Sequence, residues 1–150
     1  GAIDRHIEAI ISKTGRLPGH RKLRVALDSC NGAASILAPK LIEALGAEVV
    51  AINTTPDGKF PRGAEPTAEN ISALCQLVKD SSADVGFAQD MDADRLAVVD
   101  ETGTPIGEDY TLVLAANYVL SRQAGPLVAN LSTTSALDEV ALRYKVPLYR

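Results

Sequence analysis

The sequence predicts an α/β fold, namely a three-layer α/β/α sandwich with a mostly parallel sheet and one antiparallel hairpin. Two observations support this prediction. First, short aliphatic runs alternate with segments whose apolar residues recur at helical spacing, in the order β-α-β-α-β-β-α and then β-α-β. Second, 46% of the 150 residues are hydrophobic but only 4% are aromatic. The core must therefore consist of Ala, Val, Ile and Leu, which suits helices packed on a parallel sheet.

The N-terminal segment is predicted to be an amphipathic helix followed by a linker. Isoleucines stand at positions 3, 7, 10 and 11, a spacing that places them on one face of a helix of about three turns. Gly15 and Pro18 are residues that typically end a helix. The basic stretch GRLPGHRK at 15–22 then has the composition of a loop, so we interpret it as a linker.

Residues 23–52 are predicted to form a β-α-β unit. An aliphatic run at 23–27 is typical of a buried strand, and the stretch DSCNG follows it. Small and aliphatic residues at 33–45 indicate a helix, which Gly46 ends. A second aliphatic run at 48–52 gives the parallel partner strand, with the right-handed crossover that such units adopt.

The next stretch is predicted to contain a long loop, a helix and two strands. Residues 53–66, NTTPDGKFPRGAEP, include three prolines and two glycines, which favour irregular structure. Thr67 is a candidate N-cap for a helix whose apolar face runs over 71–78. Two further strands are predicted at 85–88 and 96–99.

The C-terminal third is predicted to continue with a turn and a second, smaller α/β unit. DETG at 100–103 indicates a tight turn that closes a hairpin. An apolar helix follows at 110–120. A strand at 127–131, a helix at 132–145 and a strand at 147–150 then begin a new unit. Because this unit is too short to close a core, we interpret the chain as part of a longer protein.

Composition and charge exclude several classes of function. The net charge is −4, and the 15 basic and 19 acidic residues are interspersed, so no basic stripe indicates a nucleic-acid partner. No run of roughly 18 apolar residues indicates a membrane span, and the N-terminus lacks the basic start of a signal peptide. We therefore expect a cytoplasmic protein in which Cys30 and Cys75, without metal-ligand spacing, are free thiols.

The stretch QDMDADRLAVVD at 89–100 has the residues best suited to chemistry. Asp90, Asp92 and Asp94 stand at every second position between two predicted strands. Three carboxylates so close together repel one another unless a cation lies among them. Oxygen ligands without His or Cys favour Mg²⁺, with Mn²⁺ or Ca²⁺ as alternatives. The alternative is a polar surface loop, and the spacing alone does not decide between the two.

Arg95, which follows the three aspartates, also allows two interpretations. Its guanidinium could receive a phosphate or carboxylate beside a metal, or it could form a salt bridge with a neighbouring aspartate. Two other stretches are weaker candidates for anion binding, DSCNGAAS at 28–35 and the loop that contains Lys59 and Arg62. We favour a tight turn with a capping Asn31 for the first and a surface loop for the second.

Taken together and in order, these stretches resemble the α-D-phosphohexomutases, which include phosphoglucomutase, phosphomannomutase and phosphoglucosamine mutase enzymes. The resemblance runs from Lys22 to Arg150 through DSCNGAAS, LGAEVVAI, PDGKFPRGAEPTAENISAL, ADVGFAQDMDADRLAVVDETG and GEDYTLVLAANYVL. Its most specific part is DMDADR, which is similar to the DGDADR or DGDGDR metal loop of the family. The order of the motifs is more specific than any one of them.

The resemblance implies a place within a four-domain enzyme. Residues 1–21 would be the tail of domain 1 and a linker. Residues 22–124 would be domain 2, the α/β/α domain that carries the metal loop, and residues 125–150 the incomplete start of domain 3. The partners of the chain would then be the remaining parts of domains 1, 3 and 4, together with a hexose or hexosamine phosphate as substrate.

The resemblance also implies roles for the site residues. Asp90, Asp92 and Asp94 would bind the catalytic Mg²⁺, and Arg95 would contact the phosphoryl group near it. In such enzymes a phosphoserine donates its phosphoryl group to a sugar phosphate. The resulting bisphosphorylated sugar reorients and returns its other phosphate to the serine, while the metal neutralises charge during transfer.

Two departures from the family pattern affect these expectations. Met91 occupies a position where the family usually has glycine, and a positive φ there would be costly for methionine. The chain also contains no SHNP-type phosphoserine loop, no sugar-reading loop of domain 3 and no phosphate-binding domain 4. We therefore expect the 150 residues alone to be inactive, and turnover by them would contradict this.

Two other functions compete with a mutase domain. The first is a non-catalytic α/β binding module for a divalent cation or a phosphorylated ligand. The second is a Mg²⁺-dependent phosphatase with an aspartyl nucleophile. The phosphatase would require a lysine close to the acidic cluster, and DMDADR has none nearby in sequence.

Overall fold

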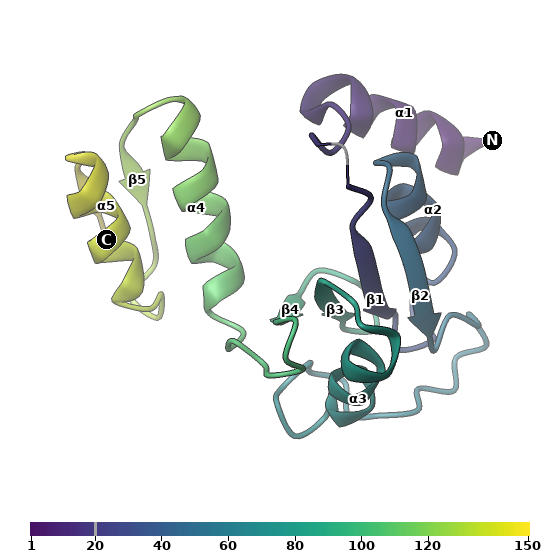
Figure 1. The fold of residues 1–150 in the computed structure, drawn as a ribbon. Coiled ribbons are helices and arrows are strands. Elements are labelled where there is room, and N and C mark those ends of the chain that lie inside the picture. Colours follow the sequence, from purple (N-terminus) through teal and green to yellow (C-terminus); the bar gives the residue numbers. More distant parts are fainter. Residues whose placement is uncertain (20) are drawn as a thin grey trace. The chain divides into compact units, whose positions relative to one another are not determined.

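The computed structural model describes residues 1–19 and 21–150 and confirms the predicted α/β fold (Figure 1). His20, which the sequence places in the linker, lies outside the described residues. The chain divides into two compact units, Gly1–Ile106 and Gly107–Arg150. The elements are α1 (Ala2–Thr14), β1 (Arg24–Asp28), α2 (Leu37–Ala44), β2 (Glu48–Ile52), α3 (Ser72–Ser81), β3 (Val85–Gln89), β4 (Leu96–Val99), α4 (Tyr110–Arg122), β5 (Leu127–Val128), α5 (Ala136–Tyr144) and β6 (Leu148–Tyr149).

The first unit contains a four-stranded sheet in the order β2-β1-β3-β4. Strand β1 is parallel to both of its neighbours, whereas β3 and β4 are antiparallel, as predicted. In this register Asp28, the last residue of β1, is paired with Ile52 of β2 and Ala88 of β3. The segments 29–36, 53–66 and 90–95 therefore all leave the sheet at one edge, which we call the carboxyl edge.

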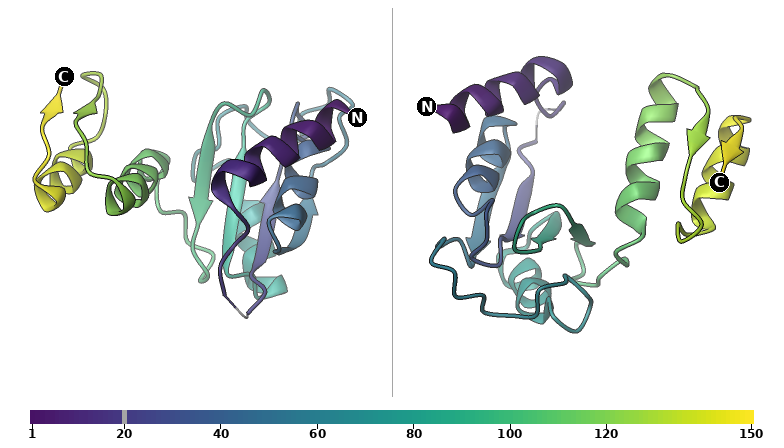
Figure 2. Two further views of the ribbon diagram at one scale, coloured as in Figure 1. Left: turned by 90° about the horizontal axis from the view of Figure 1, so that it is seen from above. Right: turned by 180° about the vertical axis from the view of Figure 1, so that it is seen from behind.

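Helices cover both faces of this sheet, which gives the predicted three layers (Figures 1 and 2). Alternate strand residues point to opposite faces. One set packs against α3 in a buried cluster that includes Ala26, Leu74, Val78, Ala88 and Val99. The other set packs on the side of α2 in a cluster that includes Leu27, Ala34, Ala38, Val49 and Phe87. Helix α1 contacts α2, so it extends the layer on that face.

Three helices begin later than the sequence predicts, and one of them, α5 in the second unit, begins at Ala136 and not at position 132. Helix α2 begins at Leu37, not at position 33, because Cys30 and Asn31 have φ angles of 50° and 53° and residues 29–36 form successive turns. Helix α3 begins at Ser72, so the prediction of Thr67 as its N-cap is wrong. The Thr67 carbonyl instead accepts the N–H groups of Asn70 and Ile71, at 3.0 and 3.2 Å, which forms a turn before the helix.

The predicted turn at 100–103 is confirmed. The Asp100 carboxylate accepts the N–H groups of Thr102 and Thr104, both at 2.9 Å. A bridge between Val99 and Pro105 then continues the antiparallel arrangement of β4. Among the described residues, Cys30 and Cys75 are free thiols, as predicted, and no helix has the length and apolar character needed to span a membrane.

The second unit consists of α4, α5 and the parallel pair β5–β6 (Figure 2). Its core contains Val113, Ala116, Leu120, Leu137 and Val140. Strand β5 covers only Leu127–Val128, so the predicted strand at 127–131 is too long. Helix α4 packs on α5 in this unit, whereas the sequence places it at the end of the preceding domain. The domain boundaries near 21 and 124 stay a prediction.

Candidate metal centre

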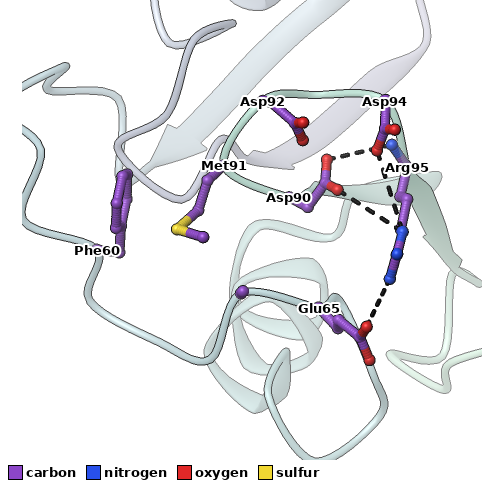
Figure 3. Close-up of a pocket in the computed structure, with 8 residues that line it drawn as sticks. Phe60, Glu65, Asp90, Met91, Asp92, Asp94 and Arg95 are labelled. Carbon is purple, nitrogen blue, oxygen red and sulfur yellow. Dashed lines mark hydrogen bonds and ion pairs between the residues drawn. The ribbon is translucent and has the colours of Figure 1, made fainter.

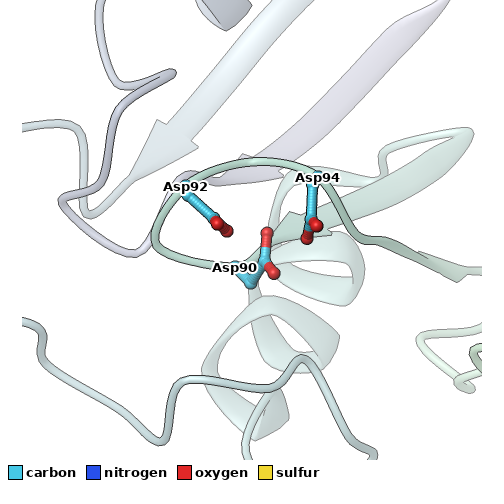
Figure 4. Close-up of side chains that lie close together, drawn as sticks. All are labelled: Asp90, Asp92 and Asp94. Carbon is cyan, nitrogen blue, oxygen red and sulfur yellow. The ribbon is translucent and has the colours of Figure 1, made fainter.

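The three predicted aspartates come together in the loop that joins β3 to β4 at the carboxyl edge (Figure 4). One carboxylate oxygen from each of Asp90, Asp92 and Asp94 lies within 4.8 Å of the other two. Asp90 is 7% exposed, whereas the other two are exposed to solvent. Three hard oxygen ligands converging on one point form a donor set that suits Mg²⁺.

Hydrogen bonds and charge repulsion among the three carboxyl groups shift the pKa values of Asp90 and Asp94 in opposite directions. Burial raises the pKa of Asp90, but hydrogen bonds from the Arg95 N–H, at 3.1 Å, and from the other two carboxyl groups outweigh it and hold that pKa below its ordinary value. The pKa of Asp94 is raised because it hydrogen bonds to Asp90 and because the charge of Asp92 lies nearby. A divalent cation would remove this repulsion.

The loop accommodates Met91 without backbone strain. The left-handed conformation lies at Ala93, with a φ of 64°, and Met91 has no positive φ. The expected cost of methionine at a glycine position would arise only if φ were positive there. Replacement of the family's usual glycine by Met91 is therefore compatible with the loop conformation.

The turn after β1 supports the metal loop from the side of the sheet. The Met91 carbonyl accepts the Ala33 N–H at 2.8 Å. A Cβ atom on Gly32 would lie 2.2 Å from the same carbonyl oxygen, a separation that non-bonded atoms do not reach. The absence of a side chain at Gly32 therefore allows the two backbones to come into contact.

Asn31, the predicted cap, instead donates to the Lys59 carbonyl at 3.1 Å and accepts the Thr55 N–H at 3.0 Å.

The proline-rich loop at 53–66 is anchored to the carboxyl edge by a buried ion pair. Arg62 Nε donates to Asp28 Oδ2 at 2.8 Å, and the two side chains are 9% and 0% exposed. The other Asp28 oxygen accepts the Cys30 N–H at 2.9 Å and the Asn53 amide at 3.0 Å. The prediction that Arg62 lies in a surface loop is therefore wrong for its side chain.

Arg95 lies beside the aspartates with its side chain 54% exposed. Its Nη1 donates to Glu65 at 2.7 Å, and its Nε lies 3.9 Å from Asp90 and 4.0 Å from Asp94 (Figure 3). The hydrogen bond and the charge of Glu65 raise the pKa of Arg95. Its closest acidic partner is thus contributed by the loop at 53–66 and is not one of the neighbouring aspartates.

The aspartates and Arg95 line one side of a cavity of about 500 Å³, and Phe60, Ala64, Glu65 and Met91 complete its lining. Figure 3 shows the Phe60 ring and the Met91 thioether on the side away from the guanidinium. The cavity therefore combines an acidic cluster, one cation and an apolar wall. Such a combination suits a ligand with both a charged group and a less polar body.

A sequence profile described as phosphoglucomutase/phosphomannomutase, alpha/beta/alpha domain II, matches residues 4–103. The chain belongs to this family. The match covers the whole of the sheet and the metal loop, and it confirms the resemblance to the phosphohexomutases inferred from the motifs.

Individual family members agree with this assignment. A phosphoglucomutase/phosphomannomutase of Thermococcus kodakarensis is 41% identical over 94% of this chain and 32% of its own length. A phosphopentomutase of the same organism is 40% identical over 94% of this chain and 31% of its own length. The crystal structure of a family protein from Burkholderia thailandensis superposes with a TM-score of 0.85 at 32% identity, covering 99% of this chain and 32% of that one. The chain thus spans about a third of the length of these relatives.

Within this family domain, the structure brings together all four predicted site residues. It also shows a supporting role for three residues that the sequence analysis placed only in weaker candidates for anion binding. The segments at the carboxyl edge are held together by Asp28, Gly32 and Arg62. None of these residues lies within the metal motif or next to it in sequence. One signal was available, since Asp28 directly follows the aliphatic run at 23–27 and a buried carboxylate requires a partner. The identity of that partner, 34 residues further along, could not be derived from spacing.

Proposed function

We propose that this chain is the metal-binding part of a phosphohexomutase, an intramolecular phosphotransferase that interconverts the 1- and 6-phosphates of a hexose or hexosamine. The convergence of three carboxylate oxygens within 4.8 Å, in a domain of this family, is the observation that carries the proposal. Relatives named phosphoglucomutase/phosphomannomutase and probable phosphoglucosamine mutase support the substrate class. A further relative is named phosphopentomutase, so relatives of similar identity differ in the substrate that their names give.

In this proposal Asp90, Asp92 and Asp94 hold Mg²⁺. Three carboxylate oxygens fill half of an octahedral shell and leave positions for a phosphoryl oxygen and water. When bound, the metal would neutralise negative charge on the phosphoryl group during transfer. The aspartates contribute ligand oxygens from a loop whose two ends are fixed by paired strands, so that little reorganisation is needed on metal binding.

Arg95 is proposed to contact the phosphoryl group near the metal. Its exposed guanidinium lies at the edge of the cavity, and a planar fork of N–H donors matches phosphate oxygens. Glu65 accepts from only one nitrogen, Nη1. This ion pair would orient the arginine while the remaining donors reach the ligand.

The nucleophilic serine, the sugar-reading loop and the phosphate anchor are proposed to lie in other domains. Residues 1–21 would then be the tail of domain 1 and a linker, 22–124 domain 2, and 125–150 the start of domain 3. The partners would be the remaining parts of those domains, in a cytoplasmic enzyme. Its phosphoserine would donate a phosphoryl group to the sugar phosphate, and the resulting bisphosphorylated sugar would return its other phosphate to the serine. The 150 residues alone would bind metal without turnover.

A chimaera tests this proposal. The chain would replace the matching segment of the Thermococcus kodakarensis phosphoglucomutase/phosphomannomutase, and mutase activity would be assayed with glucose 1-phosphate and mannose 1-phosphate. We expect activity in the chimaera and a loss of at least about a hundredfold on Asp92→Asn, since metal charge stabilisation is worth several kcal/mol. Asp80→Asn, which changes an exposed carboxylate on α3, is the matched control. An Asp92→Asn chimaera as active as this control would exclude the proposed role of the cluster.

A further inference from the structure

We propose that Arg62 is a positioning residue for the metal loop, a role that rests on the proposed function. Its buried guanidinium joins Asp28, at the end of β1, to the backbone carbonyl of Gln89, at the point where the loop leaves β3. We call these three groups the clasp. The clasp would set the direction in which the chain enters Asp90 and so the spacing of the three carboxylates.

The Arg62 guanidinium contacts acceptors in three different segments of the chain. Nε donates to Asp28 at 2.8 Å, Nη2 donates to the Gln89 carbonyl, and Nη1 donates to the Gly63 carbonyl at 3.2 Å. Three nitrogens of one rigid, planar group thus bond to three acceptors in different segments. Because the guanidinium is planar, these acceptors cannot move independently of one another.

Gln89 links the Arg62 guanidinium to the metal loop. It immediately precedes Asp90, the most buried of the three aspartates. Its side-chain oxygen also accepts the Ser29 hydroxyl at 3.2 Å. Both its backbone and its side chain are therefore bonded to the carboxyl edge, and the peptide that leads into the metal loop has a fixed orientation.

The ion pair between Asp28 and Arg62 is buried, so neither charge is compensated by solvent. The side chains of Asp28 and Arg62 are 0% and 9% exposed, and removal of one partner of such a pair leaves the other charge uncompensated. A buried ion pair of this kind is no strong source of stability in itself. Groups that orient metal ligands from behind typically change metal affinity by about 10- to 100-fold when they are removed.

The direction in which cation affinity changes distinguishes positioning by Arg62 from simple electrostatics. Arg62→Gln removes a positive charge close to a cation site and leaves the Asp28 carboxylate unpaired. Through space, both changes favour cation binding. If the clasp positions the ligands, the same variant binds the cation more weakly, which electrostatics alone does not produce.

The test is a titration of Mn²⁺ alone into this chain, followed by electron paramagnetic resonance at a temperature where circular dichroism shows each variant folded. We expect Arg62→Gln to raise the Kd for Mn²⁺ at least about tenfold. Arg62→Lys, which keeps the charge but not the planar fork, should show a smaller loss. Arg21→Gln, which removes an arginine from an exposed ion pair with Asp84, is the matched control and should leave the Kd unchanged.

A second measurement needs no variant. Because coupling between two sites is reciprocal, Mg²⁺ binding to the unmodified chain must stabilise the clasp. The Arg62 Nε–H should then exchange with solvent more slowly in nuclear magnetic resonance spectra when Mg²⁺ is saturating. An unchanged exchange rate would overturn the proposal even if Arg62→Gln fails to fold.

The outcomes distinguish the two proposals. Equal or tighter Mn²⁺ binding by folded Arg62→Gln overturns the role of the clasp and leaves the metal site intact. No Mn²⁺ binding by the unmodified chain overturns the metal site and, with it, the clasp.

Discussion

The turn after β1 lies against the metal loop at Gly32. A Cβ atom there would lie 2.2 Å from the Met91 carbonyl oxygen, and the neighbouring Ala33 N–H donates to that same oxygen. A side chain of any size at position 32 would separate these two segments. The absence of a Cβ there is therefore a structural requirement of the site, independent of the conformational freedom of glycine.

We predict that Gly32→Ala destabilises the chain by about 1–3 kcal/mol, the usual cost of overpacking, and displaces the metal loop. A lower Tm in calorimetry, together with weaker Mn²⁺ binding, would show this. Gly125→Ala is the control, since a Cβ there meets nothing within 4 Å, and it should leave both quantities unchanged. Equal Tm values for the two variants would mean that the turn and the loop do not need to be in contact.

The sequence predicted the acidic cluster but not the residues that hold it. The aspartates stand at every second position of one loop, so their proximity follows from the local spacing. The pairing of Asp28 with Arg62 depends on the path of the loop at 53–66, which its prolines and glycines leave undetermined in sequence. The left-handed residue of the loop is Ala93 and not Met91.

In the first unit, the strands were predicted closely, whereas the starts of α2 and α3 were not. The aliphatic run at 48–52 matches β2, because short aliphatic runs are typical of strands that pack between neighbouring elements. Helices α2 and α3 begin four or more residues after their predicted starts. In both cases, successive turns with hydrogen bonds of their own occupy the segment before the helix, and propensity does not distinguish such turns from a first helical turn.

The start of β1 is tied to the start of β3 by Asp84. Its backbone N–H donates to the Arg24 carbonyl at 2.8 Å, and its carboxylate accepts the Arg24 N–H at 2.8 Å and a bond from Arg21. The hydrogen bond from the Arg24 N–H is the main reason that the pKa of Asp84 lies below its ordinary value of 3.8.

The lowered pKa of Asp84 makes the stability of the folded chain depend on pH. Because the folded pKa is the lower one, the stabilising contribution is complete above 3.8 and is lost as the pH falls through the folded pKa. We predict that Asp84→Asn lowers the Tm at pH 7 and that this difference shrinks as the pH falls below about 4. Thermal melts from pH 2.5 to 7, with Asp80→Asn as control, measure it. A difference that does not change with pH would show that the charge of Asp84 is not involved.

At the scale of the whole molecule, the topology explains why the site lies where it does. The parallel strands β1, β2 and β3 lie side by side in the order β2-β1-β3 and end at the same edge, which brings the segments 29–36, 53–66 and 90–95 together there. Each contributes a different part: a close backbone contact, a buried arginine with an exposed glutamate, and the carboxylates. The alternation of strands and helices made this fold class predictable, whereas the packing of α4 with α5 was not predictable, because an apolar helix fits either unit.

The central claim is that the aspartate cluster is a metal site already formed in this chain. Isothermal titration of Mg²⁺ and Mn²⁺ into the unmodified chain, beside Asp92→Asn, tests it most directly. We predict saturable binding at one site in the unmodified chain and a loss of that binding in Asp92→Asn, because removal of one of three charged ligands leaves too few oxygens for the cation. Equal binding by the two proteins, or no binding by either, would contradict the claim.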